Sequence, residues 1–325
     1  MSEMIDTILT IMNGKGILAA DESDPTIKKR FDTYGIECNE YSRHEYRHNL
    51  FSSPGIEEYI GGIILFDETI RNAETIAPLK DKVLLGIKVD KGSKPYEAHG
   101  DNEKLTEGLD GLTERLREYK DLGASFAKWR AVLATDSSHS NVVANAYTLA
   151  RYAKKCQMEG IVPIVEPEIL MDGKHSVVDT FVATEIALNQ VFDALFYEGV
   201  ELETIILKPN MVLAGYDSEH KSLPPEAVAE FTMMCFNRVV PIAVPIIAFL
   251  SGGQPDGEAV VNLNAINNPE LPIFNTRYLT FSFGRELQQN SLQEWASGNS
   301  ESAQKAFIDR AKECQLAVRG QLWAS

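Results

Sequence analysis

Short apolar runs recur along the 325-residue chain, and each run ends in charged or small polar residues. Continuous apolar runs of this length are typical of parallel strands, because helices cover both faces of a parallel sheet. The predicted strands, each with the residue that ends it, are 16–20 before Asp21, 61–66 before Asp67, 84–87 before Lys88, 124–127 before Lys128, 161–165 before Glu166, 205–207 before Lys208, 245–250 before Ser251 and 279–284 before Arg285.

Segments with the periodicity of amphipathic helices lie between these strands. They cover residues 43–51, 103–119, 141–159, 177–197, 224–238 and 301–318. The helix predicted over 103–119 rests on leucines spaced by threes and fours, which are Leu105, Leu109, Leu112 and Leu116. Strand and helix alternate eight times, which predicts the α/β class and a (β/α)8 TIM barrel with N-terminal and inter-strand insertions.

An open, doubly wound sheet is the alternative fold. Such a sheet usually has a glycine-rich phosphate-binding turn after its first strand, whereas the Gly14-Lys15-Gly16 segment comes before that strand. No segment has the composition of a linker, so residues 1–325 are expected to form a single barrel domain.

Composition narrows the class of function. The chain has 31 basic and 47 acidic residues, a net charge of −16, which argues against sequence-independent binding of nucleic acid. The first residues lack a signal-peptide pattern, and no apolar run approaches the ~20 residues of a membrane span. We therefore expect a cytoplasmic protein without nucleic-acid or membrane partners, and with four free thiols at Cys38, Cys156, Cys235 and Cys314.

The barrel prediction also locates the active site, because in this fold it lies at the C-terminal ends of the strands. Gathering five cations and three carboxylates there costs desolvation energy, and such networks are usually retained for chemistry. The alternative interpretation is that these charged residues are ordinary strand ends exposed to solvent. The residues at these ends are Asp21, Lys88, Lys128, Arg130, Glu166, Glu168, Lys208, Ser251 and Arg285.

Lys208 is the candidate nucleophile. It ends an apolar strand, where desolvation and a second cation such as Lys128 favour the neutral amine that attacks a carbonyl and forms an imine. An imine withdraws electrons from a neighbouring carbon–carbon bond, and the reaction needs carboxylates to move protons. Glu166 and Glu168 point to the same side of their strand, and Asp21 is a third carboxylate.

Two groups of residues suit anions. The turn 251–253 exposes backbone N–H groups and Arg285 adds a guanidinium, after the strands that usually bind phosphate in this fold. Lys88, Arg130 and Arg30 are candidates for a second anion. Two phosphate sites around an imine-forming lysine indicate a bisphosphorylated ketose as substrate.

The strings GKGILAADES, GIKVDKG, FAKWR, IVPIVEPEI, LKPNMV, FLSGGQ, LNAIN and FSFGR occur in this order between residues 14 and 318. With them the chain resembles class I (Schiff-base) fructose-bisphosphate aldolases. The resemblance implies reversible cleavage of fructose 1,6-bisphosphate to dihydroxyacetone phosphate and glyceraldehyde 3-phosphate, in glycolysis and gluconeogenesis. It also implies no cofactor, no metal, and a homo-oligomer that is often a tetramer.

The resemblance assigns roles to individual residues. It implies that Lys208 forms the imine, that Glu166 is the main proton carrier beside Glu168, and that Lys128 and Asp21 complete the catalytic group. The phosphate next to the ketone would be held by Ser251, Gly252, Gly253, Ser282, Gly284 and Arg285. The other phosphate would lie toward Lys88, Arg130, Ser23 and Arg30.

This sequence departs from the family pattern at three places. Asp24-Pro25-Thr26 stands where the family often has Thr-Gly-Ser, and its extra negative charge bears on the second phosphate site. Phe283 removes a hydroxyl that the phosphate-binding string more often has. The sequence ends at Ser325 without the C-terminal tyrosine that assists proton transfer in many members, so those steps are expected to be slower here or to be served by another group.

Two rival functions are compatible with parts of the sequence. His44 to His48 fits the HExxH pattern of zinc proteases, with Glu68 as a distant third ligand, but the predicted helix would face away from the mouth of the barrel. A non-catalytic binding protein on the same scaffold is the other rival. It would be expected to have lost Lys208, Glu166 or Lys128, and all three are present.

Overall fold

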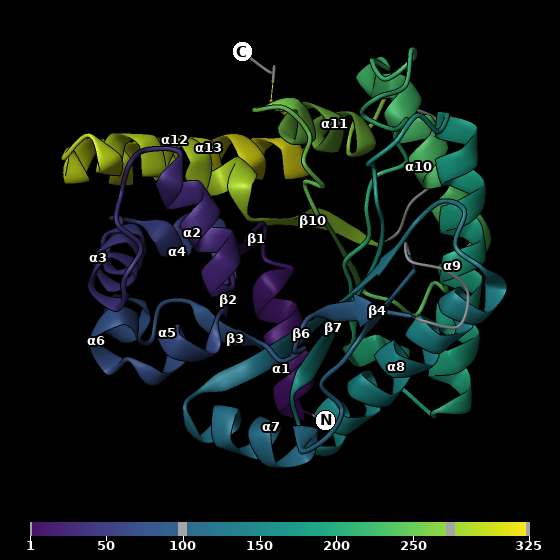
Figure 1. Cartoon of the computed structure of the whole chain (residues 1–325), viewed down its shortest axis with the longest axis horizontal. Helices are drawn as coiled ribbons and strands as arrows, with labels where there is room; N and C mark the ends of the chain where they lie inside the picture. Colours follow the sequence, from purple (N-terminus) through teal and green to yellow (C-terminus); the bar gives the residue numbers. More distant parts are fainter. Residues whose placement is uncertain (1, 97–102, 271–276, 323–325) are drawn as a thin grey trace.

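The computed structural model describes residues 2–96, 103–270 and 277–322 (Figure 1). Its centre is a closed barrel of parallel strands in the order β1-β2-β3-β6-β7-β8-β9-β10, with β10 pairing back onto β1. This confirms the predicted (β/α)8 barrel and excludes the open sheet. The barrel strands are β1 (Gly16–Ala20), β2 (Ile60–Leu65), β3 (Leu84–Lys88), β6 (Ala124–Leu133), β7 (Val162–Ile169), β8 (Ile206–Leu207), β9 (Ile246–Phe249) and β10 (Tyr278–Phe283).

Helices surround the strands in Figure 1, and those predicted at 43–51, 141–159, 177–197, 224–238 and 301–318 are confirmed. The remaining helices lie before the first strand, in the connections between strands and after the last strand. The helices are α1 (Ser2–Ile11), α2 (Asp24–Asp32), α3 (Glu40–Phe51), α4 (Ile56–Tyr59), α5 (Asp67–Arg71), α6 (Ala73–Ile76), α7 (Leu112–Asp121), α8 (His139–Met158), α9 (Val177–Tyr197), α10 (Pro225–Val239), α11 (Glu258–Ile266), α12 (Arg285–Ala296), α13 (Ser300–Val318), and 3₁₀ turns over Ala77–Leu79 and Leu202–Thr204.

The prediction of one continuous helix over 103–119 is wrong for the first half of this segment. Residues Lys104–Thr106 form strand β5, which pairs antiparallel with β4 (Ser93–Pro95) in a hairpin inserted after β3. Helix α7 begins only after Gly111, whose φ of 63° lies in the left-handed region that a continuing helix excludes. The stripe of leucines is therefore divided between two elements.

The core has two layers. Outside the strands, a large apolar cluster joins the sheet to the helices. Inside the barrel, a smaller cluster contains Met4, Ile8 and Ile11 of α1 together with the starts of several strands, such as Ile17 and Val162. Helix α1 thus closes the N-terminal end of the barrel and leaves the opposite end for the site. Among the described residues, no helix combines the length and the apolar character that crossing a membrane requires.

Candidate active site

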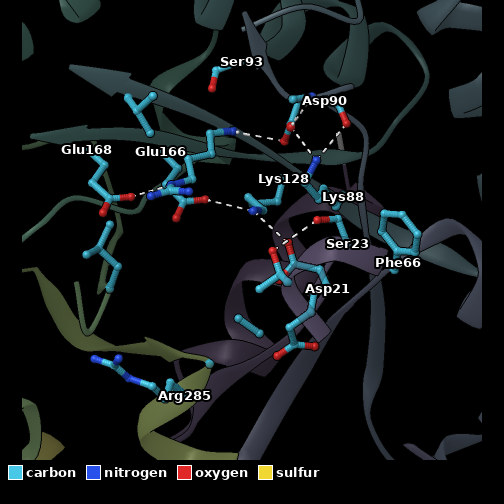
Figure 2. A pocket seen from close by; sticks show the side chains of 18 of the residues that line it. Asp21, Ser23, Phe66, Lys88, Asp90, Ser93, Lys128, Glu166, Glu168 and Arg285 are labelled. Atoms are coloured by element: carbon cyan, nitrogen blue, oxygen red, sulfur yellow. Dashed lines mark hydrogen bonds and ion pairs between the residues drawn. The ribbon is translucent and has the colours of Figure 1, made fainter. Parts of the chain in front are cut away.

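A cavity of about 1570 Å³ opens at the C-terminal ends of the strands. The structure brings every residue predicted for the site to its lining, from strand ends and loops far apart in the sequence (Figure 2). The residues brought together are Asp21, Ser23, Arg30, Lys88, Lys128, Arg130, Glu166, Glu168, Lys208, Ser251, Gly252, Gly253, Ser282, Gly284 and Arg285.

Four of these side chains form a continuous charged row in the depth of the cavity. Lys208 Nζ lies 3.2 Å from Glu166 Oε1, and Lys128 Nζ lies 3.2 Å from the other carboxylate oxygen, Glu166 Oε2. Lys128 Nζ also donates to Asp21 Oδ2 at 2.7 Å. Lys208 directly follows β8, and its backbone N–H donates to the Val165 carbonyl of β7. This hydrogen bond holds Lys208 next to the strand that carries Glu166 and Glu168.

Lys128 and Lys208 set the direction of the pKa shifts of Asp21 and Glu166. Burial alone would raise the pKa of Asp21, but the charges of Lys128 and Lys208 outweigh it and lower that pKa to about 2. Burial likewise opposes ionisation of Glu166, and Lys128, Lys208 and Arg130 overcome it and lower its pKa below the ordinary value. Burial would lower the pKa of Lys128, whereas Asp21 and Glu166 raise it. The row therefore holds ionised carboxylates and a charged Lys128 at neutral pH.

Glu168 lies one step further along β7 and has a different partner. Arg130 Nε donates to Glu168 Oε2 at 2.5 Å, so the two glutamates on the same side of β7 have different ion-pair partners. At the end of β3, which neighbours the Arg130 strand β6, Lys88 pairs with Asp90, and Asp90 also accepts a hydrogen bond from the backbone N–H of Arg130. In Figure 2, Lys88 and Asp90 lie across the pocket from Arg285, with Asp21 between them.

The turn after β9 has the backbone geometry expected of an anion site. Gly252 and Gly253 have φ of 54° and 82°, in the region that favours glycine. The Ser282 hydroxyl, at the end of β10, is buried and has no hydrogen-bond partner among the described residues. Arg285 begins α12 and donates to the Gln254 carbonyl at 3.3 Å. A helix N-terminus, a guanidinium and a buried hydroxyl therefore border one turn.

The residues near Ser23 form a second polar region. The hydroxyl oxygens of Ser23 and Thr26 lie 3.2 Å apart. Arg30 pairs with Glu22 at 2.5 Å and borders the turn after β10, since a Cβ built on Gly284 would lie 3.8 Å from Arg30 Nη2. Asp24, the extra negative charge in this region, lies 4.0 Å from the guanidinium of Arg43.

The HExxH segment lies on α3, outside the barrel. His44 Nδ1 lies 2.6 Å from the Thr75 hydroxyl, and Glu68 is held by Arg43 and Arg47 at 2.5 and 3.2 Å. The carboxylate considered as a third zinc ligand is therefore occupied by arginines. Within the described ranges, no group of three or more histidine, cysteine or acidic side chains is arranged to hold a metal ion.

Some residues of the site were not predicted from the sequence. Glu22 and Asp90 stand inside the strings AADES and GIKVDKG, so a search for buried counter-charges at strand ends would find them. Thr26 lines the cavity at a position where the sequence departs from the family pattern. Tyr216 lines the cavity from the loop after Lys208, and no sequence pattern points to it.

Comparisons with known proteins point to one family. The family model described as fructose-bisphosphate aldolase class-I matches residues 3–325. The chain is 45% identical over 324 residues to a probable fructose-bisphosphate aldolase class 1 of Xylella fastidiosa, covering 96% of this chain and 95% of the relative. It is 48% identical over 319 residues to the cytosolic fructose-bisphosphate aldolase 4 of Arabidopsis thaliana, covering 94% of this chain and 80% of that one.

A solved structure gives the same result for the fold. The fructose-bisphosphate aldolase of Plasmodium falciparum, crystallised with TRAP and a small-molecule inhibitor, superposes with a TM-score of 0.95 at 42% identity. The match covers 100% of this chain and 96% of that one. The chain belongs to the class I fructose-bisphosphate aldolase family.

Proposed function

We propose that this protein is a metal-independent carbon–carbon lyase that cleaves fructose 1,6-bisphosphate reversibly through an imine on Lys208. The observation that carries the proposal is the contact of Glu166 with both lysines, 3.2 Å from Lys208 Nζ and 3.2 Å from Lys128 Nζ. All three side chains are almost completely buried at strand ends. An amine, a proton carrier and a fixed positive charge are the groups that imine chemistry requires.

Imine formation uses Lys208 and Glu166. Glu166, whose Oε1 faces Nζ, accepts a proton from Lys208, and the neutral amine then attacks the ketose carbonyl carbon while one of its protons moves to the carbonyl oxygen, which gives a carbinolamine. Glu166 returns its proton to the carbinolamine hydroxyl, and water leaves as the protonated imine forms. Lys128 stays charged beside Glu166 and Asp21, so it stabilises the negative charge that develops as protons move.

Bond cleavage uses Asp21. The protonated imine accepts the electron pair of the adjacent carbon–carbon bond, and Asp21 accepts the proton of the hydroxyl that becomes the aldehyde. Because Lys128 and Lys208 lower its pKa, Asp21 is ionised and ready to accept this proton. The aldehyde leaves first, and protonation and hydrolysis of the enamine then release the ketone and restore Lys208.

The two phosphates have separate sites in this proposal. The phosphate next to the ketone binds the turn 251–253 with Ser282, Gly284 and Arg285, where a buried hydroxyl and glycine N–H groups face the cavity. The other binds toward Lys88, Arg130 and Ser23, with Arg30 at the border of both regions. Arg43, which is already paired with Glu68, lies 4.0 Å from the exposed Asp24, so the extra negative charge of that departure stays largely uncompensated.

Borohydride trapping tests the imine. After incubation with fructose 1,6-bisphosphate and reduction, we expect mass spectrometry to find a stable adduct on Lys208, with cleavage unaffected by a chelator. Lys208→Met should abolish the adduct, and Glu166→Gln should slow cleavage by about 100- to 10,000-fold. Lys305→Met, on the exposed face of α13, is the matched control and should change neither.

Two outcomes would contradict the proposal. Cleavage that the chelator abolishes, without an adduct on Lys208, would mean that a metal rather than an imine activates the ketose. Neither adduct nor cleavage would leave the non-catalytic binding protein as the function of this scaffold. The single-domain organisation, the homo-oligomer and the cytoplasmic location stay predictions, to be tested by limited proteolysis, sedimentation equilibrium and cell fractionation.

A further inference from the structure

Tyr216 belongs to the loop that follows Lys208, and its backbone is tied to the loop between β7 and α9. Its N–H donates to the Met171 carbonyl at 2.9 Å. The N–H groups of its neighbours Gly215 and Asp217 donate to the carbonyls of His175 and Gly173, both at 2.9 Å. Three hydrogen bonds over three consecutive residues fix the direction in which the Tyr216 side chain leaves the backbone.

The phenol of Tyr216 reaches across to the turn after β9. Its hydroxyl donates a hydrogen bond to the Gly252 carbonyl. Burial raises the pKa of Tyr216, so the hydroxyl keeps its proton and stays a donor over the physiological range. The ring also covers Gly253, because a Cβ built there would lie 3.3 Å from Tyr216 Cε2 and 3.5 Å from Arg285 Nη2. Tyr216 and Arg285 therefore flank the same glycine.

This hydrogen bond sets the direction of an N–H group. The peptide between Gly252 and Gly253 is planar and trans, so its carbonyl and its N–H point in opposite directions. Holding the Gly252 carbonyl toward Tyr216 therefore turns the Gly253 N–H away from the phenol. Among the described residues, the N–H groups of Gly252 and Gly253 donate to no protein acceptor, which leaves both for a ligand.

A turn of two glycines would otherwise be free to rotate. Glycine populates left-handed and right-handed backbone regions with similar ease, so the sequence of the turn does not by itself select the conformation with φ of 54° and 82°. A hydrogen bond from a side chain anchored on another loop provides that selection before the ligand arrives. Preorganised donors bind an anion more tightly because less conformational freedom is lost on binding.

We propose that Tyr216 is a positioning residue that holds the turn 251–253 in its anion-binding conformation. The inference rests on the proposed function, which places the phosphate next to the ketone at this turn. Tyr216 acts through the Gly252 carbonyl and not on the reacting atoms. It links the loop after the imine lysine to the phosphate turn, so that the ketose carbonyl carbon and the phosphate next to it are held in a fixed relation.

Tyr216→Phe tests the inference, because it removes the hydroxyl and keeps the ring. The substrate is fructose 1-phosphate, whose single phosphate lies next to the ketone, and inorganic phosphate serves as a competitive inhibitor. We expect the KM and the inhibition constant of phosphate to rise about three- to tenfold, the range of one net hydrogen bond, with kcat within twofold. Replacing Tyr216 by 4-aminophenylalanine restores a donor and should return both constants toward the wild-type values.

Tyr278→Phe is the matched control. Tyr278 also donates its hydroxyl to a backbone carbonyl, that of Lys15 at 2.8 Å, but at the opposite end of the barrel. It should lower the melting temperature without changing KM or phosphate inhibition. If Tyr216→Phe changes only the melting temperature, as the control does, or lowers kcat with KM unchanged, the positioning function is overturned.

Arg285→Met separates this inference from the proposed function. If it weakens phosphate inhibition while Tyr216→Phe leaves it within twofold, the phosphate site stands and only the positioning function fails. If Arg285→Met and Ser251→Ala both leave phosphate inhibition and the KM of fructose 1-phosphate unchanged, the phosphate is held elsewhere. In that case the proposed site, and the inference with it, is overturned.

Discussion

Asp21, Lys128, Glu166 and Lys208 alternate in charge along one row, and each is at least partly removed from water. Taking such charges out of water costs several kcal/mol each, which only close partners offset. Removing one member therefore leaves its neighbour as an uncompensated buried charge. The ionisation of both carboxylates depends on the two lysines. The pH dependence of the protein's stability therefore reports on the same ion pairs that the proposed reaction uses.

The stability contributed by Asp21 should depend on pH in a defined window. Its pKa is about 2 in the folded protein against an ordinary value of 3.8, so its contribution is fully present above pH 3.8 and is lost as the pH falls through about 2. The full contribution corresponds to about 2 kcal/mol. We expect Asp21→Asn to lower the melting temperature by a constant amount from pH 7 to 5, and by less at pH 3.

The control for this measurement is Asp309→Asn, whose carboxylate pairs with Lys305 on the exposed surface of α13. Exposed pairs contribute at most about 1 kcal/mol, so this variant should change the melting temperature little at any pH. A difference between wild type and Asp21→Asn that grows as the pH falls below 4 would contradict the assigned direction of the pKa shift.

The strands could be predicted from the sequence because parallel strands are buried on both faces and leave continuous apolar runs. β7 illustrates this, since Val162 to Ile169 is buried throughout, including Glu166 and Glu168. The first half of segment 103–119 could not be predicted in the same way. Its leucines fit a helical stripe, but Gly108 and Gly111 have positive φ, and pairing of β5 with β4 replaces the helical hydrogen bonds.

Gly111 offers a test of what begins helix α7. Its φ is 63°, and a Cβ built on it would meet no atom within 4 Å, so substitution there changes backbone preference alone. We expect Gly111→Ala to lower the free energy of unfolding by about 1 kcal/mol, since alanine rarely adopts this region. Gly111→Asn should cost less, because asparagine adopts left-handed conformations more readily.

Thermal unfolding of the two variants, followed by circular dichroism, provides the measurement. Equal destabilisation by alanine and asparagine would contradict the argument from φ. An increase in helical signal in Gly111→Ala would mean that glycine alone prevents a helix over 103–119, and that the pairing of β4 with β5 contributes little.

The location of the site could be predicted, but not the network within it. Barrel strands bring their C-terminal ends together, so Lys208 and Glu166 were placed correctly from sequence position alone. Tyr216 reaches Gly252 from another loop, a contact that no spacing in the sequence encodes, whereas Asp90 stands two residues after Lys88 and can be found as its counter-charge. The end of the sequence, where the tyrosine of many family members is missing, includes residues 323–325, which lie outside the described ranges.

The two ends of the barrel differ in side-chain composition and in function. At the C-terminal end, charged side chains surround a cavity that must admit a substrate. At the N-terminal end, α1 places Met4, Ile8 and Ile11 against the inner face of the strands and fills the barrel with apolar side chains. Substitutions at the closed end should therefore change stability and leave the chemistry intact, because the side chains of the charged row pair with one another at the open end.

Ile8→Ala tests this division of function. Ile8 is 3% exposed, and truncating a buried isoleucine typically costs 2–5 kcal/mol, so we expect the melting temperature to fall by several degrees. The kcat and KM for fructose 1,6-bisphosphate at 25 °C should stay within twofold of wild type. Leu9→Ala, at the adjacent and exposed position, is the control and should change neither quantity, since Leu9 is 57% exposed. A fall in kcat for Ile8→Ala while the protein remains folded would show that packing at the closed end reaches the row of charges through the strands, and the separation of the two ends would then be incorrect.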